Sequence, residues 1–350
     1  MRGGAEKVMI NLARYFKSLD YEVYLVTKTV GKIEYEVPEG IKRILADITS
    51  EEETKSRIRN LLKRIKKLRG IWKEIKPDLI LSFIRKNNLM AIASADGLGI
   101  PVVVGIRSNP ERELSGRGFK QLSFLMFKKA AGIVVQTSMA KEFLPANLQK
   151  KTVIMPNTVS GEYLGNEPTP ASERRKEIVL VGRIDSNKNQ RMVLEVFSEI
   201  MDEYREWSLH LFGDGELAAG LRNRFDCDRI VFHGHVNDVK SKIEKASVFV
   251  LPSKQEGMPN ALIEAMALGI ACISTDCPCG GPADLIEQDK NGILIPVNDR
   301  EKLKEQLCRL LDDEQFRIDL GKEASKISED MNADKVNIMW KEYLEGFIGQ

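Results

Sequence analysis

The sequence predicts an α/β protein of two domains, each built on a parallel sheet covered by helices. Its 350 residues, 43% hydrophobic and 30% charged, suit two globular domains. In the second half, short apolar strands alternate with helices, which is typical of parallel sheets buried on both faces. Residues 1–165 hold 29 Lys+Arg and 17 Asp+Glu, a net charge of +12, whereas the remainder holds 24 and 34, a net of −10. This asymmetry indicates separate roles for the halves and an anionic partner for the first.

The second domain, which we place at 174–330, has the clearer pattern. We expect its strands at 177–181, 207–212, 229–233, 247–251 and 270–275. We expect its helices at 189–204, 216–224 and 239–245, and a further one that continues to about 268. Parallel sheets bind ligands beyond the C-terminal ends of their strands. Arg183, Asp214 and Glu256 each follow such an end, so we expect the site there.

The first domain, which we place at 1–165, repeats the pattern with short strands. These are expected at 21–27, 78–83, 102–106 and 132–136. The segment 166–172 is rich in turn-forming and polar residues, and we interpret it as the linker between the domains. The chain is expected to be helical from about 300, with a last helix at 331–350 that packs back onto the first domain.

Two cations follow the first strand of the second domain. Gly182 ends that strand, and Arg183 and Lys188 lie between it and the next helix. Arginine presents a fork of donors and lysine a compact charge, so the pair suits a diphosphate. Placed in advance, such cations stabilise the charge that grows on a leaving phosphate. The alternative is a solvated basic turn.

Two carboxylates, Glu256 and Glu264, lie across a loop that becomes a helix, with Glu264 expected roughly two turns into it. Gly257 allows the backbone to approach a ligand, and Pro259 suits a helix start. Carboxylates and free amides at such a position can bind sugar hydroxyls or an anion. The alternative is a pair of surface glutamates on an ordinary helix. Together with the cations, the pair indicates a nucleotide-sugar site.

The segment from Lys55 to Lys76 contains ten basic residues and one acid, Glu74. Its apolar residues recur at helical spacing, so we expect an amphipathic helix. One interpretation is a helix packed on the sheet with a solvated basic face. The other is a face that contacts anionic lipid or a lipid-linked pyrophosphate. No aromatic stacking platform accompanies the charge, so we do not expect nucleic acid as a partner.

Composition excludes several other classes of protein. No run of about 18 apolar residues predicts a membrane span, and the start at Met1 does not resemble a signal peptide. The five cysteines are odd in number and irregularly spaced, which indicates free thiols and a cytoplasmic protein. With three histidines, and with 226–228 interpreted as a polar turn, we expect no metal site. No complete Gly-x-Gly-x-x-Gly follows a strand, which argues against an NAD-dependent dehydrogenase.

These motifs resemble those of a known family. Gly182-Arg183 with Lys188, then Gly-Asp-Gly at 213–215, Glu-Gly-x-Pro at 256–259 with Glu264, and Gly-Gly-Pro at 280–282 are similar to the retaining glycosyltransferases of group 1, family 4. That resemblance covers nearly the whole chain and implies the GT-B fold, in which two Rossmann-like domains face each other across a cleft. The residues at 185–189 and the basic segment are most similar to those of members that extend lipid-linked glycans for capsule, O-antigen or N-glycan precursors.

The resemblance also implies roles for individual residues. Arg183 and Lys188 would hold the donor diphosphate and, with Glu256, carry the catalysis, while Glu264 would bind the ribose. The remaining donor-binding positions would be Gly3 and Gly4, which face the phosphate, Gly182 and Gly213, Val236 in the base loop, and the sugar-binding Gly257, Met258, Pro259 and Asn260. The first domain would bind the acceptor. The family uses no metal and no cofactor beyond the donor, and it retains anomeric configuration.

Two departures from the family pattern affect the first domain. The family has an apolar strand before its Gly-Gly loop, whereas this chain begins almost at the loop, so we expect that strand to be missing and the neighbouring strand edges to be unpaired. Some relatives place a first-domain histidine near the sugar, but no histidine precedes His210. Arg85, Asn87 and Arg107 follow strand ends and are our candidates for acceptor contacts.

The sequence therefore predicts a cytoplasmic hexosyltransferase that can associate peripherally with the inner face of the plasma membrane. It would move a hexose or N-acetylhexosamine from a UDP-sugar to a lipid-linked saccharide in surface polysaccharide or glycan biosynthesis. Two alternatives stay open: a non-catalytic nucleotide-sugar-binding subunit, and a sugar-nucleotide epimerase on the same fold.

Overall fold

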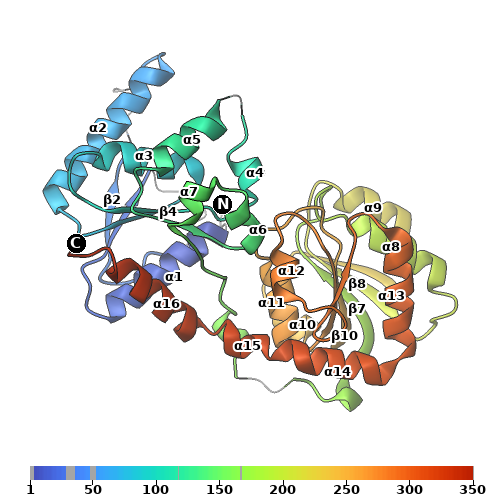
Figure 1. The fold of residues 1–350 in the computed structure, drawn as a ribbon. Helices are drawn as coiled ribbons and strands as arrows, with labels where there is room; N and C mark the ends of the chain where they lie inside the picture. Colours follow the sequence, from blue (N-terminus) through green and yellow to red (C-terminus); the bar gives the residue numbers. More distant parts are fainter. Residues whose placement is uncertain (1–3, 29–35, 48–52, 117, 166–167, 350) are drawn as a thin grey trace. The chain divides into compact units, whose positions relative to one another are not determined.

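The computed structural model describes residues 4–28, 36–47, 53–116, 118–165 and 168–349. The chain forms two compact units (Figure 1). Unit 1 comprises 1–136, 140–155 and 336–350, and unit 2 comprises 137–139 and 156–335. Apart from 137–139, the chain thus enters unit 2 at Pro156, before the segment 166–172 that composition indicated as the linker. The reason is that Val159 and Tyr163 are already buried in the core of unit 2.

Unit 2 is built on one parallel sheet of six strands, in the order β12-β11-β10-β7-β8-β9. The strands are β7 (Arg175–Val181), β8 (Ser208–Phe212), β9 (Ile230–Gly234), β10 (Ala246–Leu251), β11 (Ala271–Thr275) and β12 (Ile293–Ile295). The helices are α8 (Gln190–Ile200), α9 (Ala218–Phe225), α10 (Lys240–Ile243), α11 (Asn260–Ala267), α12 (Gly281–Leu285), α13 (Arg300–Asp312), α14 (Glu314–Ser325) and α15 (Ile327–Asp330). The five predicted strands are confirmed, with ends that differ by at most two residues.

The sheet of unit 2 is buried on both faces, which is why its strands are apolar without alternation. Along β7, Ile178 and Leu180 belong to one core cluster with α8 and α13. Val179, which points to the opposite face, belongs to a second cluster with α11. Two covering layers thus hold the sheet and fix its C-terminal edge, where the predicted site residues lie.

Unit 1 contains two separate parallel sheets in its described residues. One has the order β3-β4-β5-β6 and the other pairs β1 with β2. The strands are β1 (Tyr24–Thr27), β2 (Lys42–Leu45), β3 (Ile80–Phe83), β4 (Val102–Gly105), β5 (Gly132–Val135) and β6 (Thr152–Ile154). The helices are α1 (Gly4–Ser18), α2 (Arg57–Ile75), α3 (Arg85–Ala95), α4 (Pro110–Glu113), α5 (Phe119–Phe127) and α7 (Ala146–Gln149), while α6 (Ser138–Glu142) and α16 (Ala333–Glu345) span the division. Among the described residues, β1 and β3 do not pair.

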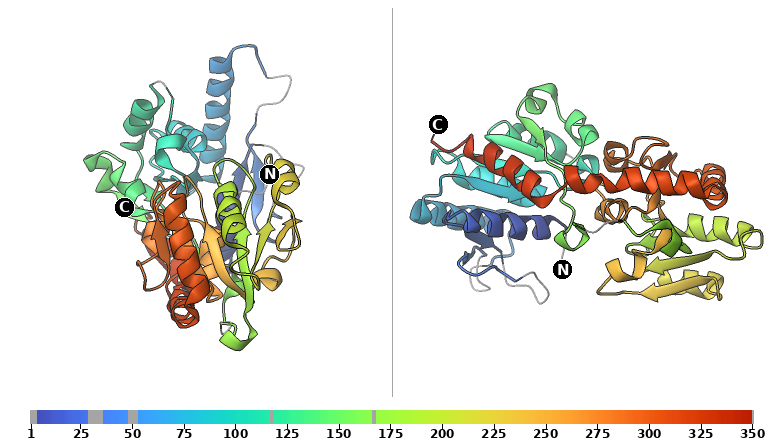
Figure 2. Two further views of the ribbon diagram at one scale, coloured as in Figure 1. Left: turned by 90° about the vertical axis from the view of Figure 1, so that its right-hand side faces the viewer. Right: turned by 90° about the horizontal axis from the view of Figure 1, so that it is seen from below.

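Helix α16 completes the core of unit 1, although it follows unit 2 in the sequence. Its residues Val336, Trp340 and Leu344 are buried in one cluster with Phe83 of β3 and Val103 of β4. The rings of Phe83 and Trp340 lie 5.9 Å apart. Figure 2 shows α16, in red, beside the blue N-terminal helix. The predicted last helix at 331–350 begins two residues later, at Ala333, and Met331 packs instead against unit 2.

Helix α2 is packed over only part of its length. In its second half Leu68, Ile71 and Trp72 are buried, and Trp72 Nε1 donates a hydrogen bond of 2.8 Å to Ser94 of α3. In its first half Ile58 is 72% exposed and Leu62 is 60% exposed. The interpretation as a packed helix therefore holds for the second half, while the first half leaves apolar and basic side chains exposed. Among the described helices, none is long and apolar enough to cross a membrane.

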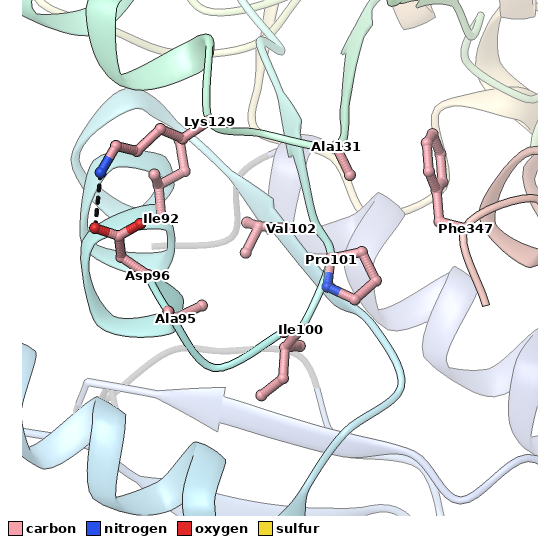
Figure 3. A pocket seen from close by; sticks show the side chains of 11 residues that line it. Ile92, Ala95, Asp96, Ile100, Pro101, Val102, Lys129, Ala131 and Phe347 are labelled. Carbon is pink, nitrogen blue, oxygen red and sulfur yellow. Dashed lines mark hydrogen bonds and ion pairs between the residues drawn. The ribbon is translucent and has the colours of Figure 1, made fainter. Parts of the chain in front are cut away.

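A cavity of about 360 Å³ lies in unit 1 at the N-terminal ends of β4 and β5 (Figure 3). Its lining includes Pro101, Ala131 and Phe347, and a 2.7 Å ion pair joins Lys129 to Asp96 beside it. Ligands of parallel sheets bind at the opposite, C-terminal, ends of the strands. We therefore assign this cavity no part in the site.

Candidate functional site

Glycines end the strands of unit 2 that carry the site. Gly182 follows β7, and its amide donates to the carbonyl of Phe212, 2.9 Å away. Gly213 follows β8, and its amide donates to Gly234, 2.8 Å away. At Gly213 φ is +142°, and a Cβ there would lie 2.0 Å from the carbonyl oxygen of Gly182. Only glycine fits this close approach, which sets the path of the loop carrying Arg183.

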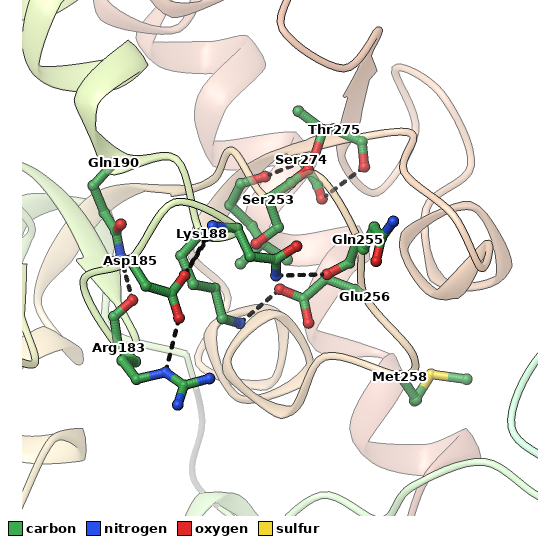
Figure 4. A network of polar contacts seen from close by, with 12 residues as sticks. Arg183, Asp185, Lys188, Gln190, Ser253, Gln255, Glu256, Met258, Ser274 and Thr275 are labelled. Carbon is green, nitrogen blue, oxygen red and sulfur yellow. Dashed lines mark hydrogen bonds and ion pairs between the residues drawn. The ribbon is translucent and has the colours of Figure 1, made fainter. Parts of the chain in front are cut away.

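Asp185 organises the loop between β7 and α8 (Figure 4). Its Oδ1 accepts hydrogen bonds from the amides of Asn187, at 3.0 Å, and Lys188, at 2.8 Å. Its Oδ2 pairs with Nε of Arg183 at 2.8 Å, although the Arg183 side chain stays 75% exposed. Because both cations of the predicted pair depend on it, Asp185 is a site residue to which the sequence analysis gave no role.

Lys188 and Glu256 form an ion pair at the centre of the site. Lys188 Nζ lies 2.6 Å from Glu256 Oε1, and the side chains are 23% and 12% exposed. Asn187 also joins the two loops: its carbonyl accepts from the amide of Lys254 at 2.7 Å, and its side chain donates to the carbonyl of Gln255 at 3.0 Å. The cation loop after β7 and the carboxylate loop after β10 are therefore brought together as predicted.

The backbone around Glu256 is held by the segment that follows β11. The Glu256 amide donates to the carbonyl of Pro278 at 2.8 Å, and the Glu256 carbonyl accepts from the amide of Cys279 at 2.7 Å. A Cβ on Gly281 would lie 1.6 Å from the carbonyl oxygen of Gly257, so that contact requires glycine. Burial raises the pKa of the nearby Cys277 thiol to about 12 and that of Cys279 as well, which keeps both thiols protonated.

Helix α11 starts with Pro259 as its N-cap residue and Asn260 as its first residue. Glu264 therefore lies little more than one turn into the helix, not the two turns that we expected, because the loop extends as far as Pro259. Met258 is buried with the core of this face. Burial, followed by the charge of Glu264, raises the pKa of Tyr163, so the Glu264 carboxylate lies near this buried ring.

Asn157 supports the Gly257–Asn260 segment from a distant part of the sequence. Its side-chain amide donates to the carbonyl of Met258 at 3.0 Å and to Oδ1 of Asn260 at 2.7 Å. Asn157 is 8% exposed. It is a second residue that sequence reasoning missed, since a Pro-Asn pair signals only a turn.

The other predicted donor-binding positions are Val236, Gly3 and Gly4. Val236 follows β9 and is partly buried against the cluster that contains α11. Gly4 is the first residue of α1, whereas Gly3 lies outside the described residues. Among the described residues, no group of three or more His, Cys, Asp or Glu side chains is placed to hold a metal ion.

The acceptor candidates Arg85 and Arg107 lie in unit 1 around a carboxylate that the sequence analysis did not single out. Glu113 Oε1 accepts from the amide of Arg85 at 2.8 Å, and Oε2 accepts from Ser108 Oγ at 2.7 Å. Burial raises the pKa of Glu113, opposed by these bonds and by the charge of Arg85. Burial also lowers the pKa of Arg107 to about 10, against the favourable charge of Glu113.

Asn87 is not part of this group by any described contact. Its side-chain amide donates to the carbonyl of Phe83, the last residue of β3, at 3.3 Å. Arg85, in contrast, also donates to the carbonyl of Ser115 at 2.6 Å and lies over the ring of Phe119, 5.2 Å from its centroid. The ends of β3 and β4 thus bring together Arg85, Arg107 and Glu113.

Models of known families match both parts of the chain. Residues 2–162 match the model described as Glycosyltransferase Family 4, and residues 175–313 match the model described as Glycosyl transferases group 1. A GalNAc-α-(1→4)-GalNAc-α-(1→3)-diNAcBac-PP-undecaprenol α-1,4-N-acetyl-D-galactosaminyltransferase of Campylobacter jejuni is 27% identical over 347 residues, covering 97% of this chain and 94% of that protein. A UDP-Gal:α-D-GlcNAc-diphosphoundecaprenol α-1,3-galactosyltransferase of Escherichia coli is 23% identical, with 90% and 86% covered.

Solved structures share the fold over almost the whole chain. A glycosyltransferase of Rickettsia africae has a TM-score of 0.81 at 16% identity, covering 99% of this chain and 96% of its own. The lipopolysaccharide outer core galactosyltransferase WaaB has a TM-score of 0.76 at 20% identity, covering 98% and 96%. HepE of Anabaena in complex with UDP has a TM-score of 0.79 at 14% identity, also covering 98% and 96%. The chain therefore has the GT-B fold and belongs to the group 1, family 4 glycosyltransferases, which are retaining, metal-independent hexosyltransferases.

Proposed function

We propose that this glycosyltransferase moves a hexose or N-acetylhexosamine from a UDP-sugar to a lipid-linked saccharide, with the donor bound at the strand ends of unit 2. The observation that carries the proposal is the 2.6 Å contact between Lys188 and Glu256, which unites the cation loop with the carboxylate loop. The relatives from C. jejuni and E. coli, whose names specify undecaprenol-linked acceptors, support this class of acceptor.

In this proposal each of the two cations is paired with a carboxylate until the donor binds. Arg183 rests on Asp185 and Lys188 rests on Glu256. A bound diphosphate would take over these contacts and release Glu256, with the amides of Gly257 to Asn260, for hydroxyls of the donor sugar. Glu264 would bind the ribose hydroxyls, and the loop at Val236 would hold the base.

The proposed reaction breaks the bond between the anomeric carbon and the diphosphate oxygen, and the bonding electrons leave with the diphosphate. Arg183 and Lys188 stabilise the charge that develops on that oxygen. The acceptor hydroxyl attacks the same face of the sugar, and its proton passes to the departing phosphate, so configuration is retained. Arg85 and Arg107, arranged around Glu113, are proposed to contact the acceptor.

The basic helix α2 is proposed to contact an anionic membrane surface or the pyrophosphate of the acceptor. Several of its cations already make contacts within unit 1: Arg64 pairs with Asp47 at 2.9 Å, and Arg69 donates to the carbonyl of Ser94 at 3.1 Å. Arg59, Lys63 and Lys66 are separated by four and three residues, so they share one face, and the structure leaves them exposed. Replacing these three with serine should lower binding to anionic vesicles and make it less dependent on salt.

The donor site is tested by UDP binding and by sugar transfer. Arg183→Ala should weaken UDP binding in calorimetry and lower kcat/KM by about 10²–10³-fold, equivalent to about 2.7–4 kcal/mol of transition-state stabilisation. Arg191→Ala is the matched control, because Arg191 is exposed and pairs with Glu195 within α8 at 2.7 Å. Equal UDP affinity and turnover in the wild type and Arg183→Ala would contradict the proposed donor site.

The two alternatives predict different products. A non-catalytic binding subunit would bind UDP-sugar without transfer or hydrolysis, and an epimerase would change the sugar without any acceptor. Incubation of the wild type with a UDP-sugar, with and without a diphosphate-linked lipid acceptor, separates all three. Transfer that requires the acceptor supports the proposal, which family membership already favours.

A further inference from the structure

Helix α5 carries an exposed apolar ridge that the proposed donor and acceptor sites do not use. Phe119, Leu122 and Leu125 are 50%, 45% and 61% exposed. They recur every three residues and therefore form one face of the helix. Other positions of the helix are fixed in unit 1, because Ser123 and Phe127 are fully buried. The ridge is thus a firmly held feature of the surface rather than the edge of a loose segment.

The sequence around the ridge is rich in cations. Residues 114–141 contain five Lys and Arg but no Asp or Glu. Lys120 lies over the ring of Phe143, 4.3 Å from its centroid, and Lys128 is exposed at the end of the helix. An apolar strip bordered by cations matches an anionic bilayer, whose headgroups attract the cations while the interface accepts the apolar side chains.

The ridge starts beside an acceptor candidate. The guanidinium of Arg85 lies over the ring of Phe119, 5.2 Å from its centroid. Phe119 is the first residue of α5, and the ridge continues from it along the helix to Leu125. The ridge would therefore bring Arg85 close to the membrane in which a lipid-linked acceptor resides.

We propose that the α5 ridge inserts into the interface of an anionic bilayer and forms a membrane contact separate from the basic face of α2. The exposed apolar side chains in the first half of α2, Ile58 and Leu62, lie on another helix that packs against α3. In Figure 1, α2 and α5 both appear beside α3. The inference relies on the proposed function only for the choice of a membrane as partner, and it is independent of the sugar transferred.

The test uses the full chain and vesicles of phosphatidylcholine with about one quarter phosphatidylglycerol. The ridge variant is Leu122→Ser with Leu125→Ser, and the matched control is Ile338→Ser, which removes a 48% exposed isoleucine of α16. Co-flotation is measured at low salt and at about 0.5 M salt, where exposed charges are screened. We expect the ridge variant to partition about tenfold more weakly, with the larger relative loss at high salt, and the control to match the wild type.

A second variant, Leu125→Trp, reports insertion directly. The three native tryptophans, Trp72, Trp207 and Trp340, are all buried, so the indole introduced by Leu125→Trp would be the one exposed to solvent. We expect its emission to shift to the blue on vesicles and to be quenched by brominated lipid. The proposal is overturned if the ridge variant binds like the wild type, if Leu125→Trp emission is unchanged on bound protein, or if the wild type binds no vesicles. A wild-type dimer in solution that the ridge variant abolishes would assign the ridge to a second copy instead.

The same measurements separate this inference from the proposed function. Loss of vesicle binding in the α2 serine variant, with no effect of the ridge variant, would refute the ridge and leave the role of α2 intact. Absence of sugar transfer by a chain that still inserts its indole in the Leu125→Trp variant would refute the reaction and leave the ridge intact.

Discussion

The exchange Gly213→Ala tests whether the strand-end geometry sets the position of Arg183. The new Cβ would lie 2.0 Å from the carbonyl oxygen of Gly182, whereas ordinary contact begins at 3.4 Å. The chain between Gly182 and Arg183 would have to move by more than 1 Å, since both partners are backbone. Displacements of about 1 Å can lower turnover about 10²-fold, and the positive φ adds about 1–3 kcal/mol of strain.

The assay compares urea unfolding and kcat/KM of Gly213→Ala with those of Gly220→Ala. Gly220 lies in α9 with open space around it, so alanine there should leave activity unchanged and raise the unfolding free energy by about 0.5–1 kcal/mol. We expect Gly213→Ala to lose stability and at least tenfold in kcat/KM. If Gly213→Ala keeps both wild-type stability and wild-type turnover, the argument from close approach is refuted.

Three further predictions follow from the contacts described above. Lys188→Met and Glu256→Gln should be coupled in a double-mutant cycle of unfolding free energies by about 0.5–3 kcal/mol, because the pair is largely buried, and strict additivity would contradict the contact. Glu113→Gln should flatten the pH dependence of stability. The folded state holds the proton of Glu113 more tightly than the unfolded state does, so the unfolding free energy of the wild type falls as pH rises from the usual pKa of 4.5 through the raised pKa. An unchanged slope would count against the burial of Glu113. Iodoacetamide should label the exposed Cys227 in the native protein but Cys277 and Cys279 only after unfolding, as mass spectrometry of tryptic peptides would reveal.

The second domain could be predicted well because its signals are local. Strands such as Ala246–Leu251 are buried at every position, and turn glycines such as Gly213 mark where strands end. The association of Lys188 with Glu256 also followed from the rule that strand ends meet at one edge of a parallel sheet. No comparable rule places Asn157 against Met258, since that contact joins residues 101 positions apart.

The first domain was harder to predict for physical reasons. Helical periodicity in the Lys55–Lys76 segment treats all apolar residues alike, so it could not separate the buried Trp72 from Ile58, which is 72% exposed. Which half of the helix is covered depends on the neighbouring helix α3. The role of Glu113 could not be predicted from the sequence, because a single glutamate in a polar segment matches no motif. Its contacts with Arg85 and Ser108 form only when the chain folds.

The contribution of α16 to unit 1 has a consequence for synthesis on the ribosome. The core around Phe83 and Val103 lacks Trp340 until unit 2, residues 156–335, has been translated. At roughly 5–20 residues per second this takes about 10–40 s. During that interval the nascent first unit presents an apolar surface that a chaperone can bind, whereas unit 2 can fold as soon as it leaves the exit tunnel. The order of folding should therefore be the reverse of the order of synthesis.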